Sequence, residues 1–221
     1  MTHPVWHYSG VLLISTVLLM AQPMAARALE PGSWYGQVSA GKAWIESYTH
    51  TNTVTGVTDT ENLSSEWGLG GAIGYAFRSV PLRLEGEYTY YHALTSDPGG
   101  GGDTERFHVG MANAYYDLHL GDSLKRWQPY VGFGVGFAVD DMALTRTNGT
   151  TYTRHDSAFA YQVKSGVAYE LTPSWDMVLG YRYLHIGERS WMNSVSQLTL
   201  RDPVNLHFFE VGLRTSLNFF K

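Results

Sequence analysis

His155 and Ser157 have the residue types and the spacing that nucleophilic catalysis uses. In a β-strand, residues two positions apart lie on the same face, so an imidazole would stand beside a hydroxyl group that it could deprotonate. We therefore take His155 as a candidate general base and Ser157 as a candidate nucleophile. A full catalytic triad also needs a carboxylate that orients the imidazole, and the spacing alone does not identify one.

Metal, thiol and nucleic-acid chemistry are not indicated. The chain has no cysteine, which excludes disulfides and thiolate chemistry. Its net charge is −5 and no basic run exceeds two residues, which argues against a nucleic-acid footprint. Five further histidines lie on separate segments without the spacing of metal ligands: His92, His108, His119, His185 and His207. We expect no metal, no cofactor and no nucleic-acid partner.

The first 28 residues are predicted to be a secretory signal peptide. The apolar core at residues 11–20 is too short to span a bilayer, and the small-x-small sequence Ala26-Arg27-Ala28 suits signal peptidase. We predict cleavage after Ala28, which leaves residues 29–221 as one exported domain. The segment before the apolar core carries no Lys or Arg, so a short membrane anchor is the alternative interpretation.

The exported part alternates large apolar residues with small or charged ones. Only 16% of the chain is charged, 14% is aromatic and there are 24 glycines, a composition that favours strands with two differently solvated faces. At residues 131–139, every odd position is Val or Phe and every even position is Gly or Ala. Seven further segments repeat this period of two: residues 34–44, 67–77, 82–90, 106–118, 159–169, 175–183 and 209–219. The alternation slips near Asn113, which predicts a β-bulge there.

The connections between these segments alternate in length. The short ones are residues 78–81, 121–125 and 171–174, and the long ones are 50–65, 95–104, 142–156 and 190–205. Such alternation over eight strands is typical of an all-β fold, the eight-stranded antiparallel up-and-down transmembrane β-barrel, with turns in the periplasm and loops outside. Asn148-Gly149 predicts a type I′ turn at the tip of a hairpin that extends the fifth and sixth strands.

The charged faces of the strands are predicted to point into the barrel. A soluble, lipocalin-like barrel would need an apolar interior and a polar outside, with more Lys and Glu opposite the aromatic residues than this chain has. With the apolar residues in lipid, the charges pair in a narrow lumen where eight strands leave room only for side chains. The predicted lumen network contains Glu66, Arg83, Glu85, Glu87, Lys164, Asp176, Arg182, Glu210 and Arg214.

Four short segments of the chain resemble sequences of the OmpA/Opa-type outer-membrane barrel family, whose members are called opacity or surface-antigen proteins. They are residues 113–118 (NAYYDL), 129–136 (PYVGFGVG), 160–167 (AYQVKSGV) and 179–183 (LGYRY). The end of the chain, with Phe219 and Phe220, resembles the assembly-signal strand of such barrels, which implies the barrel-assembly machinery as a partner. His155 and Ser157 are similar to the His-x-Ser of lipid A deacylases, in which Asn follows the Ser where this chain has Ala158.

The resemblance implies a surface protein in the outer membrane of a Gram-negative bacterium. Its loops would contact other cells, host molecules or lipopolysaccharide, on a barrel that contributes to envelope integrity and that we expect to be monomeric. The candidate binding residues in the loops are Tyr48, His50, Tyr152, Arg154, Trp191, Met192 and Arg201. The alternatives are a plain envelope scaffold, a small porin-like channel and an outer-leaflet lipid A hydrolase. Because paired charges would plug the lumen, we expect little or no conductance.

Overall fold

The computed structural model describes residues 29, 31–45, 48–52, 58–61, 66–96, 102–145, 151–192, 198–201 and 203–217. In these ranges the chain forms twelve strands and one short 3-10 helix, η2 (Asp122–Leu124). No helix in these ranges is long and apolar enough to cross a membrane. The predicted signal peptide and the predicted assembly signal, Phe219 and Phe220, lie outside the described residues.

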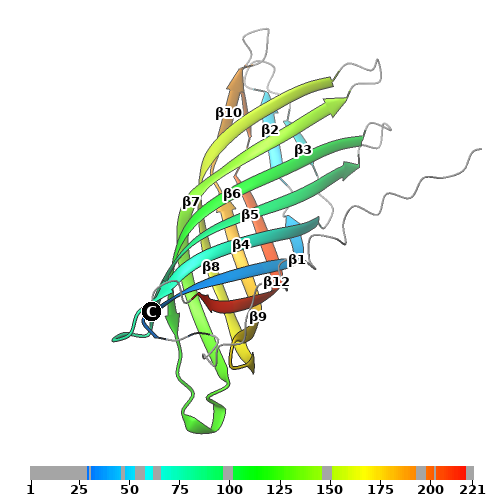
Figure 1. Ribbon diagram of the computed structural model, residues 1–221. Helices are drawn as coiled ribbons and strands as arrows, with labels where there is room; N and C mark the ends of the chain where they lie inside the picture. Colours follow the sequence, from blue (N-terminus) through cyan, green and yellow to red (C-terminus); the bar gives the residue numbers. More distant parts are fainter. Residues whose placement is uncertain are drawn as a thin grey trace, which may run out of the picture.

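Eight strands close into one antiparallel barrel, which confirms the predicted fold (Figure 1). Their order around the barrel is β1-β12-β9-β8-β7-β6-β5-β4, so the first strand of the barrel pairs with the last. The strands are β1 (Ser33–Ile45), β4 (Glu66–Ala76), β5 (Leu82–Ser96), β6 (Gly102–Asp117), β7 (Trp127–Thr145), β8 (Thr151–Thr172), β9 (Trp175–Ile186) and β12 (Val204–Leu217).

A second sheet of four strands forms from two of the long connections (Figure 1). Its order is β10-β11-β2-β3, with bounds β10 (Arg189–Met192), β11 (Leu198–Arg201), β2 (Tyr48–Asn52) and β3 (Thr58–Glu61). We call it the extracellular sheet, because long connections of such barrels face outward. The sequence analysis treated these stretches as loops, and that detail is wrong. The four strands have only four or five residues each, and apart from Leu198 and Leu200 on β11 they carry no alternation of apolar residues.

The longest hairpin of the barrel agrees with its prediction. Strands β7 and β8 stay paired as far as Thr145 and Thr151, and they are the two longest of the described barrel strands. The predicted turn at Asn148-Gly149 lies outside the described residues.

Alternation along the strands separates a lipid-facing surface from a lumen. On β7, Phe137 is 64% exposed on the outside, whereas the glycines at even positions face inward. A Cβ atom at Gly132 would meet the ring of Tyr115, and one at Gly134 would meet the amide of Asn113. The bare backbone of β7 therefore makes room for the side chains of β6.

Aromatic residues form two girdles around the outside of the barrel, one near each membrane boundary. Trp67 and Tyr75 on β4, like Tyr161 and Tyr169 on β8, are eight residues apart. Eight residues span about 26 Å along a strand, or about 20 Å along the membrane normal at the usual tilt of 35–45°. This spacing is close to the apolar band of about 25 Å that outer-membrane barrels present to lipid.

The structure of β6 shows that the predicted β-bulge near Asn113 is wrong. The strand pairs with β5 and with β7 without a break in register, so there is no bulge at Asn113. Phe107, Val109 and Met111 are buried inside the barrel, in the same phase as Asn113. The error arose because these three apolar side chains were assigned to the lipid-facing side by residue type. In the described barrel strands, a register shift occurs instead near the end of β8, between residues 170 and 172.

Candidate functional site: a sealed lumen and an extracellular sheet

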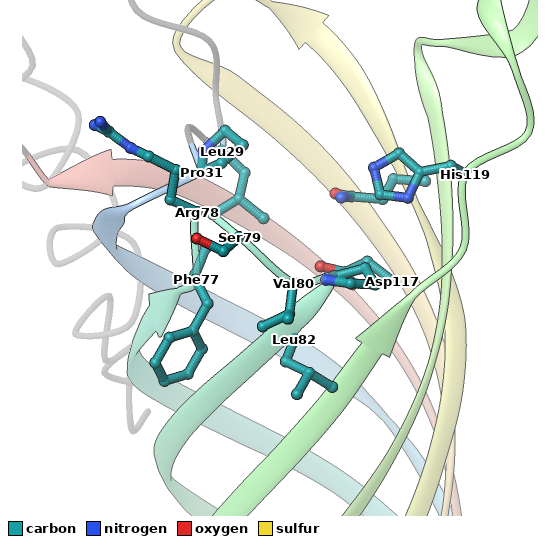
Figure 2. A pocket seen from close by; sticks show the side chains of 12 residues that line it. Leu29, Pro31, Phe77, Arg78, Ser79, Val80, Leu82, Asp117 and His119 are labelled. Atoms are coloured by element: carbon teal, nitrogen blue, oxygen red, sulfur yellow. The ribbon is translucent and has the colours of Figure 1, made fainter.

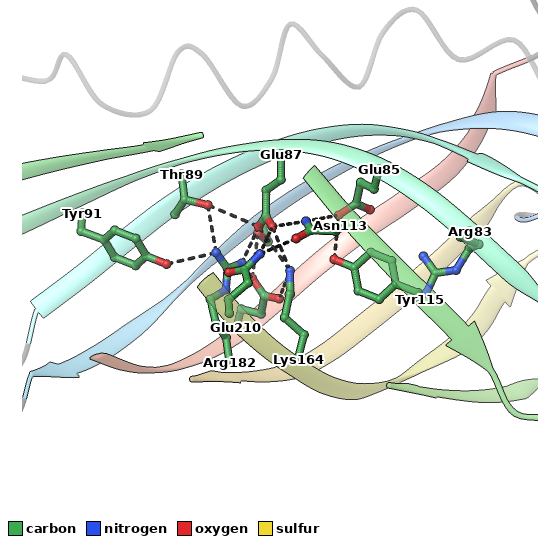
Figure 3. A network of polar contacts seen from close by, with 12 residues as sticks. Arg83, Glu85, Glu87, Thr89, Tyr91, Asn113, Tyr115, Lys164, Arg182 and Glu210 are labelled. Carbon is green, nitrogen blue, oxygen red and sulfur yellow. Dashed lines mark hydrogen bonds and ion pairs between the residues drawn. The ribbon is translucent and has the colours of Figure 1, made fainter. Parts of the chain in front are cut away.

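Four buried charged side chains form a ring of alternating sign in the lumen (Figure 3). They are Glu87 of β5, Lys164 of β8, Arg182 of β9 and Glu210 of β12. Arg182 Nη2 donates to Glu87 Oε1 and, over 2.7 Å, to Glu210 Oε2. Lys164 Nζ lies 3.2 Å from Glu87 Oε1 and 3.0 Å from Glu210 Oε1. Each cation contacts both carboxylates, so the four charges balance within the group, as buried ions require.

Neutral polar side chains add further hydrogen bonds to this charged ring. Gln162 Nε2 and Asn113 Nδ2 donate to Glu87 Oε2 over 3.0 and 2.8 Å. Arg182 Nη1 donates to Thr89 Oγ1 and to Tyr91 OH, each over 3.1 Å. The sequence analysis assigned none of these four neutral residues to the site. Their inward phase was the available signal, and the misassigned alternation of β6 hid it for Asn113.

A second charged group lies nearer the periplasmic end of the lumen. Arg83 Nε is 2.8 Å from Asp117 Oδ2, and the Arg83 guanidinium lies 4.5 Å from the ring centre of Tyr115. Glu85 accepts hydrogen bonds from Tyr35 OH and Tyr115 OH, each over 2.8 Å. The structure thus brings two predicted lumen residues, Arg83 and Glu85, into one cluster. The ion-pair partner, Asp117, was not among the predicted residues.

A third buried ion pair joins β12 to β9. Arg214 Nη2 of β12 lies 2.8 Å from Asp176 Oδ2 of β9 and donates to Gln128 Oε1 over 3.0 Å. Eight of the nine predicted lumen residues are therefore buried inside the barrel. The ninth, Glu66, begins β4, and its side chain lies outside the described part of the structure. Asp140 of β7 is a further buried acid, in the inward phase that the glycines of β7 define.

The outer half of the lumen is mostly apolar, with Asp140 as a buried acid opposite Phe107, and the sequence analysis did not predict this layer. Leu184, Leu206 and Phe208 have no solvent exposure, and the rings of Tyr91 and Phe208 pack edge to face with centres 5.2 Å apart. The layer comprises Ala43, Tyr91, Phe107, Val109, Met111, Ala138, Ala158, Ala160, Leu184, Ile186, Val204, Leu206 and Phe208. The period of two in β9 continues to Ile186, so a longer strand prediction would have found part of it.

In planar lipid bilayers, this barrel is expected to give no stable conductance steps. The apolar layer blocks the outer half of the lumen and the ion pairs fill the rest, so we expect no continuous polar path through the described part of the barrel. Single-channel recording measures this, with an open porin inserted in the same bilayer as the positive control. Long-lived steps at either polarity would contradict the sealed lumen.

The periplasmic end of the barrel opens into a shallow pocket of about 290 Å³ (Figure 2). Its lining includes Leu29, Pro31, the turn at residues 77–81, Asp117 and His119. Gly32, with a φ of 84°, turns the chain from this pocket into β1, and its amide donates to Ala76 O over 2.7 Å. The cleavage predicted after Ala28 would leave the new N-terminus at this mouth. The lining offers no set of groups with an evident catalytic arrangement.

The structure places the seven candidate loop residues on strands outside the membrane band: Tyr48 and His50 on β2, Trp191 and Met192 on β10, Arg201 on β11, and Tyr152 and Arg154 on β8. Three of these strands belong to the extracellular sheet, where the register sets His50 opposite Arg201 and Arg201 opposite Arg189. The side chains of the seven residues lie outside the described part of the structure. The sheet nevertheless unites two segments that are far apart in the sequence.

The hydrolase candidates lie at the outer edge of the apolar band. Ser157 is exposed on β8, in the same phase as the lipid-facing Phe159. His155 belongs to the same strand, and its side chain lies outside the described part. The register sets Asp141 of β7 opposite His155. The topology therefore places an acidic residue next to the candidate base, which spacing along the sequence could not reveal.

Within the described ranges, no three His, Asp or Glu residues are grouped so that they could hold a metal ion. His92, His108, His185 and His207 lie instead on four different barrel strands, each beside aromatic side chains.

Comparison with known proteins identifies the fold. The family model described as outer membrane protein beta-barrel domain matches residues 11–215. Neisserial surface protein A has a TM-score of 0.57 at 20% identity, over 85% of this chain and 100% of its own. The outer membrane protein OprG from Pseudomonas aeruginosa has a TM-score of 0.55 at 13% identity, over 88% and 99%. The outer membrane protease OmpT from Escherichia coli has a TM-score of 0.51 at 9% identity, over 85% and 97%. No curated protein matches the chain.

Proposed function

Because the chain belongs to the outer membrane protein β-barrel domain family, and to its OmpA/Opa-type class of eight-stranded barrels, we propose that it is a surface protein that binds a ligand through its extracellular sheet. The ligand is a molecule of another cell, of a host surface or of the matrix. In this proposal the chain is exported by the signal at residues 1–28, is inserted by the barrel-assembly machinery and acts as a monomer. The sealed lumen supports the proposal, because a barrel that passes no solute leaves its exposed parts to carry a function.

The observation that carries this proposal is the strand pairing outside the membrane. The register aligns His50 with Arg201 on one side and with Asp59 on the other, across three strands of one sheet. Trp191 lies on the next strand, opposite Thr199. A surface that is ordered before binding loses less conformational entropy than free loops lose. Trp, Tyr and Arg are also the residue types that dominate binding hot spots.

Replacing Trp191 and Arg201 together with alanine is expected to weaken adhesion of cells that display the protein by about tenfold or more, the effect of losing one hot-spot residue. The measurement is the attachment of these cells to host cells and to matrix proteins. The matched control is the Arg126→Ala, Trp127→Ala double variant, which changes the same two residue types at the periplasmic end of the barrel.

A barrel that lacks residues 48–61 and 189–201 separates adhesion from a purely structural role. If this deletion variant attaches as well as the wild type, the adhesion proposal fails and an envelope scaffold takes its place. Heat-modifiable gel mobility verifies that each variant is folded.

Hydrolysis has less support than binding. Ala158 follows Ser157 where lipid A deacylases have Asn, so the resemblance stops at His155 and Ser157. OmpT is a protease by its own description, but at 9% identity its likeness to this chain concerns the fold.

A further inference from the structure

The extracellular sheet continues four adjacent strands of the barrel wall (Figure 1). Its strands β10, β11, β2 and β3 lie in the same order as β9, β12, β1 and β4, to which the chain joins them directly. On β2, Tyr48 and His50 have the parity of the exposed Trp44 of β1. On β11, Arg201 has the parity of the exposed Phe209 of β12. The side of the sheet that contains these positions therefore continues the outside of the barrel, and we call it the outer face.

The outer face contains every charged and every aromatic residue of the four strands. Residues opposite each other in an antiparallel pair share a face, as do residues two positions apart on one strand. By this register the outer face consists of Tyr48, His50, Asn52, Asp59, Glu61, Arg189, Trp191, Thr199 and Arg201. The other face has Leu198, Leu200 and Met192 among Ser and Thr residues. Antiparallel sheets commonly have one solvated face, and the outer face has the composition for it.

One row of the register crosses all four strands on the outer face. Arg189 is opposite Arg201, and Arg201 is opposite His50. His50 is in turn opposite Asp59, and Glu61 follows two positions later on the same face. Because neighbouring strands lie about 4.8 Å apart, the row is about 14 Å long. The row therefore changes from basic at one end to acidic at the other, over a length that a short oligosaccharide covers.

The two arginines at the basic end favour an anionic occupant. Like charges directly opposite each other destabilise a sheet, whereas two guanidinium groups hold one carboxylate by charge-assisted hydrogen bonds. Two acidic residues are close in the sequence. Glu188 is exposed before Arg189 and has the opposite parity, and Asp202, which follows Arg201, lies outside the described residues. The register therefore pairs Arg201 with Arg189 and His50, and with no acid among the described strands.

The remaining residues of the outer face indicate a sugar. Trp191 is two positions from Arg189, and Tyr48 is two positions from His50, so an aromatic residue flanks the row on each side. Aromatic rings have flat apolar faces, against which the apolar face of a sugar can pack. At the other end, a carboxylate such as that of Asp59 accepts hydrogen bonds from hydroxyl groups. The acidic end also disfavours a ligand that is negative along its whole length.

We propose that the outer face binds an oligosaccharide that ends in a carboxylated sugar. The sugar carboxylate lies between Arg189 and Arg201, and the neutral sugars extend along the row towards Asp59. Trp191 and Tyr48 pack against the sugar rings. This inference rests on the function proposed for the extracellular sheet, since it names the chemical class of the ligand. A ligand with one acidic end matches the change of sign across the row, which a polyanion does not.

Calorimetric titration of the folded barrel in detergent micelles tests the site, with 3′-sialyllactose as the carboxylated probe. Lactose, which lacks the acidic sugar, is expected to bind the wild type about tenfold more weakly or worse, the effect of losing hydrogen bonds to a charged group. The Arg189→Gln, Arg201→Gln double variant keeps two amide donors and loses both charges. It is expected to bind 3′-sialyllactose as weakly as the wild type binds lactose.

Two further variants complete the design. The Thr51→Ala, Ser190→Ala variant changes the other face of the same strands and should titrate like the wild type. The Asp59→Asn, Glu61→Gln variant removes the acidic end and should bind dextran sulfate, a polyanion, more tightly than the wild type does. The proposal is overturned if 3′-sialyllactose does not bind, if lactose or dextran sulfate binds the wild type equally well, or if the Gln double variant retains the wild-type affinity.

Adhesion assays separate this inference from the proposed function. If alanine at Trp191 and Arg201 abolishes attachment of cells while 3′-sialyllactose neither binds nor competes, the sheet is adhesive and the ligand class is wrong. If 3′-sialyllactose binds although deletion of the sheet leaves attachment unchanged, the sugar site is correct and the adhesion proposal fails.

Discussion

Replacing Arg182 with alanine is expected to lower the free energy of unfolding by about 3–5 kcal/mol, the cost of removing one partner from a buried ionic group. Arg182 has no solvent exposure and contacts both Glu87 and Glu210. Without it, two buried carboxylates share the single charge of Lys164. Glu87→Ala is expected to cost a similar amount, because it leaves two cations with one carboxylate. Urea unfolding in lipid vesicles, followed by tryptophan fluorescence, measures the change.

Two matched variants separate charge balance from loss of packing. Arg182→Lys keeps a cation and is expected to destabilise less than alanine does. The Arg182→Ala, Glu210→Gln double variant removes one charge of each sign and should recover part of the loss. An unchanged urea midpoint for Arg182→Ala, together with unchanged heat-modifiable gel mobility, would refute the view that the lumen depends on this group.

The second large effect is expected for valine at Gly132 on β7. Its Cβ would overlap the ring of Tyr115, which is itself held by a hydrogen bond to Glu85 and lies against the Arg83 guanidinium. Overpacking of a close-packed site costs about 1–3 kcal/mol, and here the displaced ring would also strain a buried charged cluster. We expect Gly132→Val to assemble poorly and to unfold at a lower urea concentration.

Gly110→Val is the matched control for this substitution. Gly110 lies on the adjacent strand, β6, on the lipid-facing side, and a Cβ atom there meets nothing within 4 Å. A β-branched residue suits a strand, so this variant should be at least as stable as the wild type. Equal destabilisation by both substitutions would show that loss of glycine, rather than contact with Tyr115, is responsible.

Where large and small residues alternate along a strand, residue type alone was enough to predict which face of the strand meets lipid. On β7 the alternation of Val or Phe with Gly sufficed, because only one assignment of its faces puts the bulky side chains in lipid. On β6 the same argument failed, because Phe107 and Val109 are apolar residues of the lumen. An apolar layer inside a barrel makes the two faces alike in composition, so type alone cannot distinguish them there.

Partners across strands could not be predicted from the sequence. Lys164, Arg182 and Glu210 were expected in the lumen, but their grouping with Glu87 depends on the register of four strands. The extracellular sheet is a stronger case, since β2 and β11 have only five and four residues and their pairing joins distant segments. The alignment of His50 with Arg201 follows from where each connection leaves the barrel, which no local pattern encodes.

The pairing of β1 with β12 has a consequence for the order of assembly. The hydroxyl groups of Ser33 and Ser216 lie 3.5 Å apart although 183 positions separate them in the chain. Contacts of such long range form slowly, because the intervening chain must first be ordered. Strand β12 also brings Glu210 to Arg182 and Arg214 to Asp176. Closure of the barrel and completion of the ion pairs of Arg182 and Asp176 are therefore one late event, which the chain reaches only after its last strand has been delivered.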